Sequence, residues 1–164
     1  MAPLWSRKRD MLYLFFFATH LPIIFMVDTV PILPAALQTD LMHRVRDFYV
    51  NTYHDKFFEA PQPVWFTAFI WMELLYHAPL SLWAVGALIR DDPMVPVHLL
   101  VFGMQSFVTT VACLAEVWSW TDRSLVEKQN ITMLYGPYIA FGGLVALDMF
   151  TRLRRQLCLK PKQE

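Results

Sequence analysis

Apolar residues gather in four long stretches of the chain, and polar residues fill the segments between them. The stretches cover residues 11–33, 64–89, 95–117 and 131–150. Each is close to the ~20 residues that an α-helix needs to cross a hydrocarbon core of ~30 Å. The pattern therefore predicts an all-α membrane protein, a bundle of four transmembrane helices in a single domain that spans residues 1–164.

The composition agrees with lipid as the surrounding solvent. The chain is 56% hydrophobic and 17% charged, with a mean hydropathy of +0.36, which is too apolar for a soluble domain of this size. The formal net charge is zero and no basic patch alternates with aromatic residues, so nucleic acid is not an expected partner. The two cysteines, Cys113 and Cys158, should lie at different depths. We therefore expect no disulfide framework, no metal ion and no cofactor.

The distribution of Lys and Arg predicts the orientation. Nine of the fourteen lie before the first apolar stretch, in the second loop or in the tail 151–164. By the positive-inside rule, both termini face the cytosol. The first apolar stretch is longer than the core of a signal peptide and is interrupted by Asp28, so we interpret it as a retained helix.

The first loop, residues 34–63, contains a helical pattern of its own. Apolar positions and one threonine recur at helical spacing, with Thr39 or Asp40 as the N-cap. These positions are Leu41, Val45, Phe48 and Thr52. We expect a lumenal helix over the mouth of the bundle, and a plain surface helix is the alternative.

Ionisable side chains inside membrane spans are costly, so each is a functional candidate. Asp28 lies near the end of the first predicted helix and His20 about two turns earlier, while Glu73 and His77 share one face of the second. Because these helices run in opposite directions, a rise of ~1.5 Å per residue brings Asp28 and Glu73 to similar depths. The same rise per residue, applied to the third and fourth predicted helices, places three further polar residues at the depth of Asp28 and Glu73: Thr109, Thr110 and Tyr138.

Two neighbouring carboxyls in a low-dielectric layer cannot both ionise cheaply. One should hold a proton while the other stays charged. Such a pair can bind an amine that enters from lipid, or stabilise a carbocation during catalysis. The alternative is that Asp28, Glu73 and His77 only hold helices together. For His20, the favoured interpretation is a hydrogen bond to backbone freed by Pro22.

Prolines and glycines in the spans indicate how the helices bend and pack. Pro79 and Pro137 remove backbone donors and should kink their helices, which can open space in a bundle. Gly136, Gly142 and Gly143 permit close approach of neighbouring helices.

Three short signals concern modification and sorting. Asn130-Ile131-Thr132 is a glycosylation sequon, but it adjoins the fourth predicted helix, so we expect no glycan. Cys158 is a candidate for palmitoylation in the basic tail. Lys160 and Lys162, near the C-terminus, resemble the dilysine signal that returns membrane proteins to the endoplasmic reticulum.

Short motifs follow each other in a fixed order along nearly the whole chain. They are His20-Leu-Pro-Ile with Asp28, Tyr49 with Asp55, Pro63-Val-Trp65-Phe66, Glu73-Leu with Pro79, Thr109-Thr110, and Gly136-Pro137-Tyr138. In this order and spacing the motifs resemble those of the sigma-2 receptor (transmembrane protein 97) family, which belongs to the wider EXPERA group that includes emopamil-binding sterol isomerases.

The resemblance implies a four-helix homodimer of the endoplasmic reticulum membrane with a lipid-accessible cavity for sterols and cationic amphiphilic amines, and a role in sterol homeostasis or trafficking. It implies that Asp28 pairs with the ligand amine and that Glu73 supports this pairing. Thr110 and Tyr138 match positions in the cavity wall, and Asp55 matches a loop carboxylate that holds structure. We count Tyr49, His20 and His77 as further ligand-binding candidates.

Two other functions stay open. A branch of the family is linked to the delivery of mitochondrial precursors from the reticulum surface. In the isomerase branch a histidine precedes the glutamate, whereas here Glu73 precedes His77, which stands where the vertebrate receptor has glutamine. If the protein were a sterol Δ8–Δ7 isomerase, Glu73, His77 and Asp28 would move the protons. Binding without catalysis is the favoured interpretation.

Overall fold

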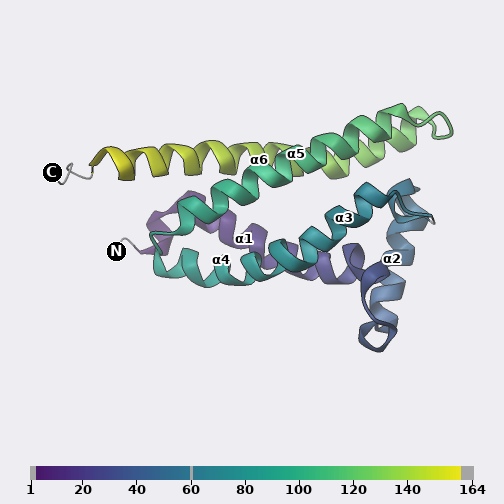
Figure 1. Ribbon diagram of the computed structural model, residues 1–164, viewed down its shortest axis with the longest axis horizontal. Coiled ribbons are helices and arrows are strands. Elements are labelled where there is room, and N and C mark those ends of the chain that lie inside the picture. Colours follow the sequence, from purple (N-terminus) through teal and green to yellow (C-terminus); the bar gives the residue numbers. More distant parts are fainter. Residues whose placement is uncertain (1–2, 60, 160–164) are drawn as a thin grey trace. The chain divides into compact units, whose positions relative to one another are not determined.

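The computed structural model describes residues 3–59 and 61–159, and all regular elements in this part of the chain are helical. The chain forms two compact units, one up to Asp91 and one from Asp92 onward. Within the described residues, four helical stretches are long and apolar enough to cross a membrane (Figure 1): Lys8–Asp28, Val64–Arg90, Val95–Ser119 and Leu125–Cys158. The predicted all-α architecture with four spans is confirmed.

In the first unit, α1 (Lys8–Ile23) lies alongside the second span, which consists of α3 (Val64–Met72) and α4 (Ala78–Arg90) (Figure 1). The buried side chains of α1 recur at helical spacing, among them Tyr13, Phe17 and His20. Such a stripe marks the face of a helix that packs against its neighbour.

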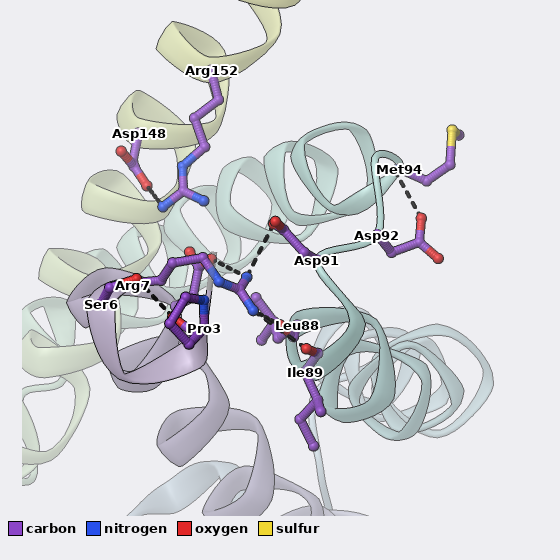
Figure 2. A network of polar contacts seen from close by, with 11 residues as sticks. Pro3, Ser6, Arg7, Leu88, Ile89, Asp91, Asp92, Met94, Asp148 and Arg152 are labelled. Atoms are coloured by element: carbon purple, nitrogen blue, oxygen red, sulfur yellow. Dashed lines mark hydrogen bonds and ion pairs between the residues drawn. The ribbon is translucent and has the colours of Figure 1, made fainter. Parts of the chain in front are cut away.

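An arginine joins the beginning of α1 to the end of α4, where the last backbone carbonyls need donors. Arg7 Nη2 donates to the carbonyl oxygens of Leu88 (2.8 Å) and Ile89 (3.3 Å). Arg7 Nη1 pairs with Asp10 at 2.7 Å. The same nitrogen pairs with Asp91 at 3.1 Å (Figure 2). This network fixes the two helix ends against each other.

Each of the first two spans contains a π-helical turn. One, η2 (Ile24–Asp28), ends the first span, and the other, η6 (Glu73–His77), separates α3 from α4. Pro79 is the second residue after η6. It lacks the backbone N–H that an α-helix needs, and its ring would crowd the preceding turn. Widening that turn by one residue relieves the crowding, and π turns of this kind occur frequently at functional sites.

The first span ends earlier than predicted, at Asp28 and not at residue 33. Pro31 and Pro34 follow within six residues, and a residue before proline disfavours the α conformation. The chain therefore continues in short 3₁₀ turns, Val30–Ile32 and Ala35–Leu37.

The predicted loop helix is present as α2 (Asp40–Tyr53), and Thr39 caps it by accepting a hydrogen bond from the Met42 backbone N–H at 3.3 Å. It packs on η2, at the end of the first span. The expected apolar face does not make this contact, because Leu41 and Phe48 are 57% and 68% exposed.

In the second unit, α5 (Val95–Ser119) and α6 (Leu125–Leu159) form an antiparallel pair (Figure 1). Their backbones touch where a Cβ atom on Gly103 would lie 2.8 Å from the Gly142 carbonyl oxygen. The expectation of close packing is confirmed for Gly142. For Gly136, an added Cβ would meet none of the described residues within 4 Å, so its part in close packing stays a prediction, and Gly143 lies against the Phe107 ring.

α6 is longer than the predicted 131–150. It begins after a capping box in which the Ser124 backbone N–H donates to Glu127 (2.8 Å) and the Glu127 backbone N–H donates to Ser124 Oγ (3.3 Å). It then continues through Pro137 to Leu159, so part of the predicted tail 151–164 is helical. An ion pair of 2.7 Å between Arg152 and Asp148 supports this extension.

Candidate functional site

Asp28 closes the π turn η2, at the last residue of the first span. The turn is fixed by Thr29, whose backbone N–H and Oγ1 both donate to the Ile24 carbonyl oxygen at 2.9 Å. Thr29 is buried, and the Asp28 side chain is half-buried. The turn therefore presents a carboxyl at the end of the first span.

Glu73 opens the second π turn, η6, and His77 closes it. Glu73 is half-buried and His77 is buried. The turns η2 and η6 contact each other, and the Glu73 and Asp28 carboxyls interact electrostatically. The structure therefore brings together the two acids that depth counting placed at one level.

Two histidines of the first and second spans, His20 and His77, lie close to each other. Their ring centroids lie 6.3 Å apart, with the ring planes tilted by 55°. His20 also stacks on Phe16, at 5.0 Å between centroids and 26° between planes. Both imidazoles are thus packed between the two spans. Proton transfer by Glu73 and His77 in an isomerase stays a prediction.

Asp55 lies behind Asp28 and is completely buried. Its Oδ1 accepts from the Phe57 backbone N–H at 3.0 Å, and its Oδ2 accepts from the Tyr49 hydroxyl at 2.9 Å. It also interacts electrostatically with Asp28. These bonds connect α2 to the 3₁₀ turn Lys56–Phe58 and agree with a structural role for Asp55, with Tyr49 as its partner.

Arg46 is a member of this cluster that the sequence analysis missed. It is half-buried on α2, and Nη2 donates to the Phe58 carbonyl oxygen at 2.8 Å, with the guanidinium 5.5 Å from the Phe58 ring centroid. Burial lowers the pKa of the Arg46 guanidinium, and the Asp47 and Asp28 carboxylates oppose this effect. Arginine nevertheless stays charged in proteins, so a fixed cation lies near Asp28.

A signal for Arg46 does exist in the sequence. Arg46, Tyr49, Val50 and Tyr53 lie at helical spacing, directly before Asp55. All four are half-buried, whereas the neighbouring Arg44 is exposed. This face combines polar and apolar residues, and an amphipathic helix is recognised by a face of apolar residues. The pattern therefore did not indicate that Arg46 is partly buried.

Two predicted cavity residues belong to the second unit. Thr110 lies on α5 and is half-buried, and its Oγ1 donates to the Ser106 carbonyl oxygen at 2.7 Å. Tyr138 lies on α6, one residue after Pro137, and is half-buried. Their contribution to a ligand site stays a prediction.

The two modification signals lie on α6. Asn130 lies within the helix, and Thr132 Oγ1 donates to the Lys128 carbonyl oxygen at 2.7 Å. That this sequon carries no glycan stays a prediction. Cys158 is exposed near the end of α6. Lys160 and Lys162 lie outside the described residues.

The chemistry of the first-unit cluster is that of a binding site for charged or polar groups. It joins the carboxyls of Asp28 and Glu73 to the Arg46 guanidinium where the first span ends. Ionisable groups at such depth mark binding sites and pathways in membrane proteins. Within the described residues, no group of three or more His, Cys, Asp or Glu side chains is arranged to hold a metal ion.

A family model matches most of the chain. Residues 41–149 match the model described as EXPERA, the expanded EBP superfamily. The chain belongs to the EXPERA superfamily. The matched region contains Tyr49, Asp55, Glu73, His77, Thr110 and Tyr138, whereas His20 and Asp28 precede it.

Curated relatives cover most of this EXPERA chain. Efficient mitochondria targeting-associated protein 19 of Schizosaccharomyces pombe is 33% identical over 88% of this chain and 76% of its own length. Sigma intracellular receptor 2 of Xenopus tropicalis is 23% identical over 88% of this chain and 89% of its own. The human sigma intracellular receptor 2 is 22% identical over 90% of both chains. The resemblance to the sigma-2 receptor family is thereby confirmed.

Proposed function

We propose that this EXPERA protein binds cationic amphiphilic amines and sterols from the membrane, with the Asp28 carboxylate as the anchor for a ligand's ammonium group. The observation that carries the proposal is the meeting of two carboxyls, Asp28 and Glu73, on two touching π turns. Because both acids cannot ionise cheaply together, Glu73 holds a proton and donates a hydrogen bond. A sterol hydroxyl can use the same two groups.

Saturation binding of a radiolabelled tertiary-amine amphiphile to the purified protein tests this function. Asp28→Asn removes the ion pair and should weaken binding on the order of 100-fold, since breaking a buried charge pair costs several kcal/mol. Glu73→Gln removes one proton donor and should weaken binding about tenfold. Glu116→Gln, a carboxyl on α5 to which we assign no role, is the control. Unchanged affinity in both site variants would contradict the proposal.

A second candidate function is suggested by one relative. Efficient mitochondria targeting-associated protein 19 has the highest identity among the relatives reported above. A targeting factor of this kind would act through protein contacts, so Asp28→Asn and Glu73→Gln should leave the import of mitochondrial precursors unchanged. If both variants lose import together with amine binding, the two functions share one site.

The cellular setting belongs to the same proposal. We place the protein in the endoplasmic reticulum membrane as a homodimer, with both termini in the cytosol and a role in sterol homeostasis or trafficking. The support is the distribution of Lys and Arg, the pair Lys160 and Lys162, and the similarity to sigma intracellular receptor 2.

A further inference from the structure

The Arg46 guanidinium is fixed by contacts with Phe58, but one of its terminal nitrogens has no hydrogen-bond acceptor among the described residues. Nη2 donates to the Phe58 carbonyl oxygen at 2.8 Å, and the group lies over the Phe58 ring. The other terminal nitrogen, Nη1, is buried and has no hydrogen-bond acceptor among the described residues. A buried donor of this kind needs an acceptor, and a guanidinium is shaped for the oxygens of a carboxylate or phosphate.

The position of Arg46 relative to Asp28 is the second observation. Helix α2 packs on η2, and Arg46 interacts electrostatically with Asp28. Asp28 is the last residue of the first span, while Arg46 lies outside the four spans. A negative and a positive group therefore lie near each other at the end of the first span.

The opposite charges of Asp28 and Arg46 restrict which charged groups a ligand can carry. An ammonium group that pairs with Asp28 also experiences the like charge of Arg46, which opposes its binding. Asp55 does not supply the missing acceptor, because it is completely buried and its oxygens accept from the Tyr49 hydroxyl and the Phe57 backbone N–H, while Arg46 Nη1 stays without an acceptor among the described residues. A ligand that carries an anionic group next to its ammonium satisfies both Asp28 and Arg46.

We propose that the site takes zwitterionic amphiphiles, whose ammonium group pairs with Asp28 and whose adjoining phosphate accepts hydrogen bonds from Arg46. Phosphocholine and phosphoethanolamine headgroups on an apolar chain have this chemistry. The inference rests on the proposed function, since it uses Asp28 as the ammonium anchor, and it defines the headgroup that the site selects.

Three single-chain amphiphiles with the same tail test the inference: an alkylphosphocholine, an alkyltrimethylammonium and an alkyl phosphate. Binding to the purified full chain in maltoside micelles is measured by isothermal titration calorimetry. The alkylphosphocholine should bind at least tenfold more tightly than the alkyltrimethylammonium. Arg46→Met should abolish or reverse this preference, whereas Arg44→Met, an exposed arginine on the same helix, should preserve it.

Arg46→Gln serves as a second variant, because its amide can still donate to the Phe58 carbonyl while the charge is gone. It should lose the preference for alkylphosphocholine while it keeps the elution profile of the wild type. A short-chain diacyl phosphatidylcholine in the same assay distinguishes a bilayer lipid from a single-chain lipid as the source of the headgroup.

The outcomes separate this inference from the function on which it rests. If the wild type binds alkyltrimethylammonium as tightly as alkylphosphocholine, or if Arg46→Gln keeps the wild-type preference, the zwitterion inference is wrong and the amine site stands. If the wild type binds none of the three amphiphiles and no tertiary amine, both are wrong.

Discussion

Asp28 is the residue at which the functional groups of the first unit meet. Glu73 interacts with it from the second span, Asp55 from the turn after α2, and Arg46 from α2 itself. In the function that we propose, the balance among these groups decides which ligands bind. The oxygens of Asp55 accept hydrogen bonds from Tyr49 and from the Phe57 backbone N–H, which agrees with a structural role for this carboxyl.

Tyr49→Phe tests this structural role. The variant removes the hydroxyl that donates to Asp55 and leaves a buried carboxylate oxygen without that bond. We expect a loss of about 1–3 kcal/mol in the free energy of unfolding. Thermal unfolding in detergent measures it, with Tyr53→Phe, whose ring lies 5.2 Å from that of Tyr49, as the control. Equal unfolding temperatures for the two variants would mean that the Tyr49 hydroxyl stabilises nothing.

At the residue scale, the sequence indicated the two acidic members of the cluster but not the arginine that lies beside them. Asp28 and Glu73 are recognisable because ionisable residues are rare in apolar stretches. Arg46 lies in a polar helix that also contains Arg44 and Asp47, and only its burial against Phe58 distinguishes it. Burial of this kind depends on how the loop folds back, which no local pattern encodes.

At the scale of elements, the two π turns and the crossing of α5 and α6 determine the geometry. The turns η2 and η6 place Asp28, Glu73 and His77 where the first two spans touch. In the second unit, Gly103 and Gly142 let the backbones of α5 and α6 meet. Small residues are the usual basis of close helix packing in membranes.

Gly103→Ala tests the crossing. The new Cβ would lie 2.8 Å from the Gly142 carbonyl oxygen and 2.9 Å from the Ala146 backbone nitrogen, and backbone atoms cannot rotate away. Overpacking of this kind should cost about 1–3 kcal/mol and lower the unfolding temperature in detergent.

Gly136→Ala is the matched control, since nothing lies within 4 Å of the added atom. Alanine is also the better helix former, so this variant should be neutral or slightly more stable. If Gly103→Ala proves as stable as Gly136→Ala, the close crossing is not a determinant of the fold.

Helix existence was predictable, while several helix ends were not. The spans follow from length and hydropathy, and the Thr39 cap follows from a local signal. The start of α6 was also readable, because Ser124 and Glu127 have the spacing of a capping box before the apolar run. The π turns were not, because the sequence shows Pro79 but not whether its helix bends or widens.

At the scale of the whole molecule, membership of the EXPERA superfamily accounts for four apolar helices in a chain of 164 residues. The sequence predicted this architecture because the membrane allows few alternatives: a spanning segment must satisfy its backbone internally. The ligand of the site that we propose depends on a few side chains and on their exact placement. For that reason a direct map of the bound ligand is needed.

Photo-crosslinking provides this map most directly. A tertiary-amine amphiphile with a diazirine beside its ammonium group is bound to the purified protein and activated by light. Mass spectrometry of the peptides should then find the label on η2 (Ile24–Asp28) or η6 (Glu73–His77). Excess unlabelled amine and Asp28→Asn should each suppress it. Labelling of these turns that persists undiminished in Asp28→Asn, or specific labelling only elsewhere, would contradict a carboxylate-anchored ligand site.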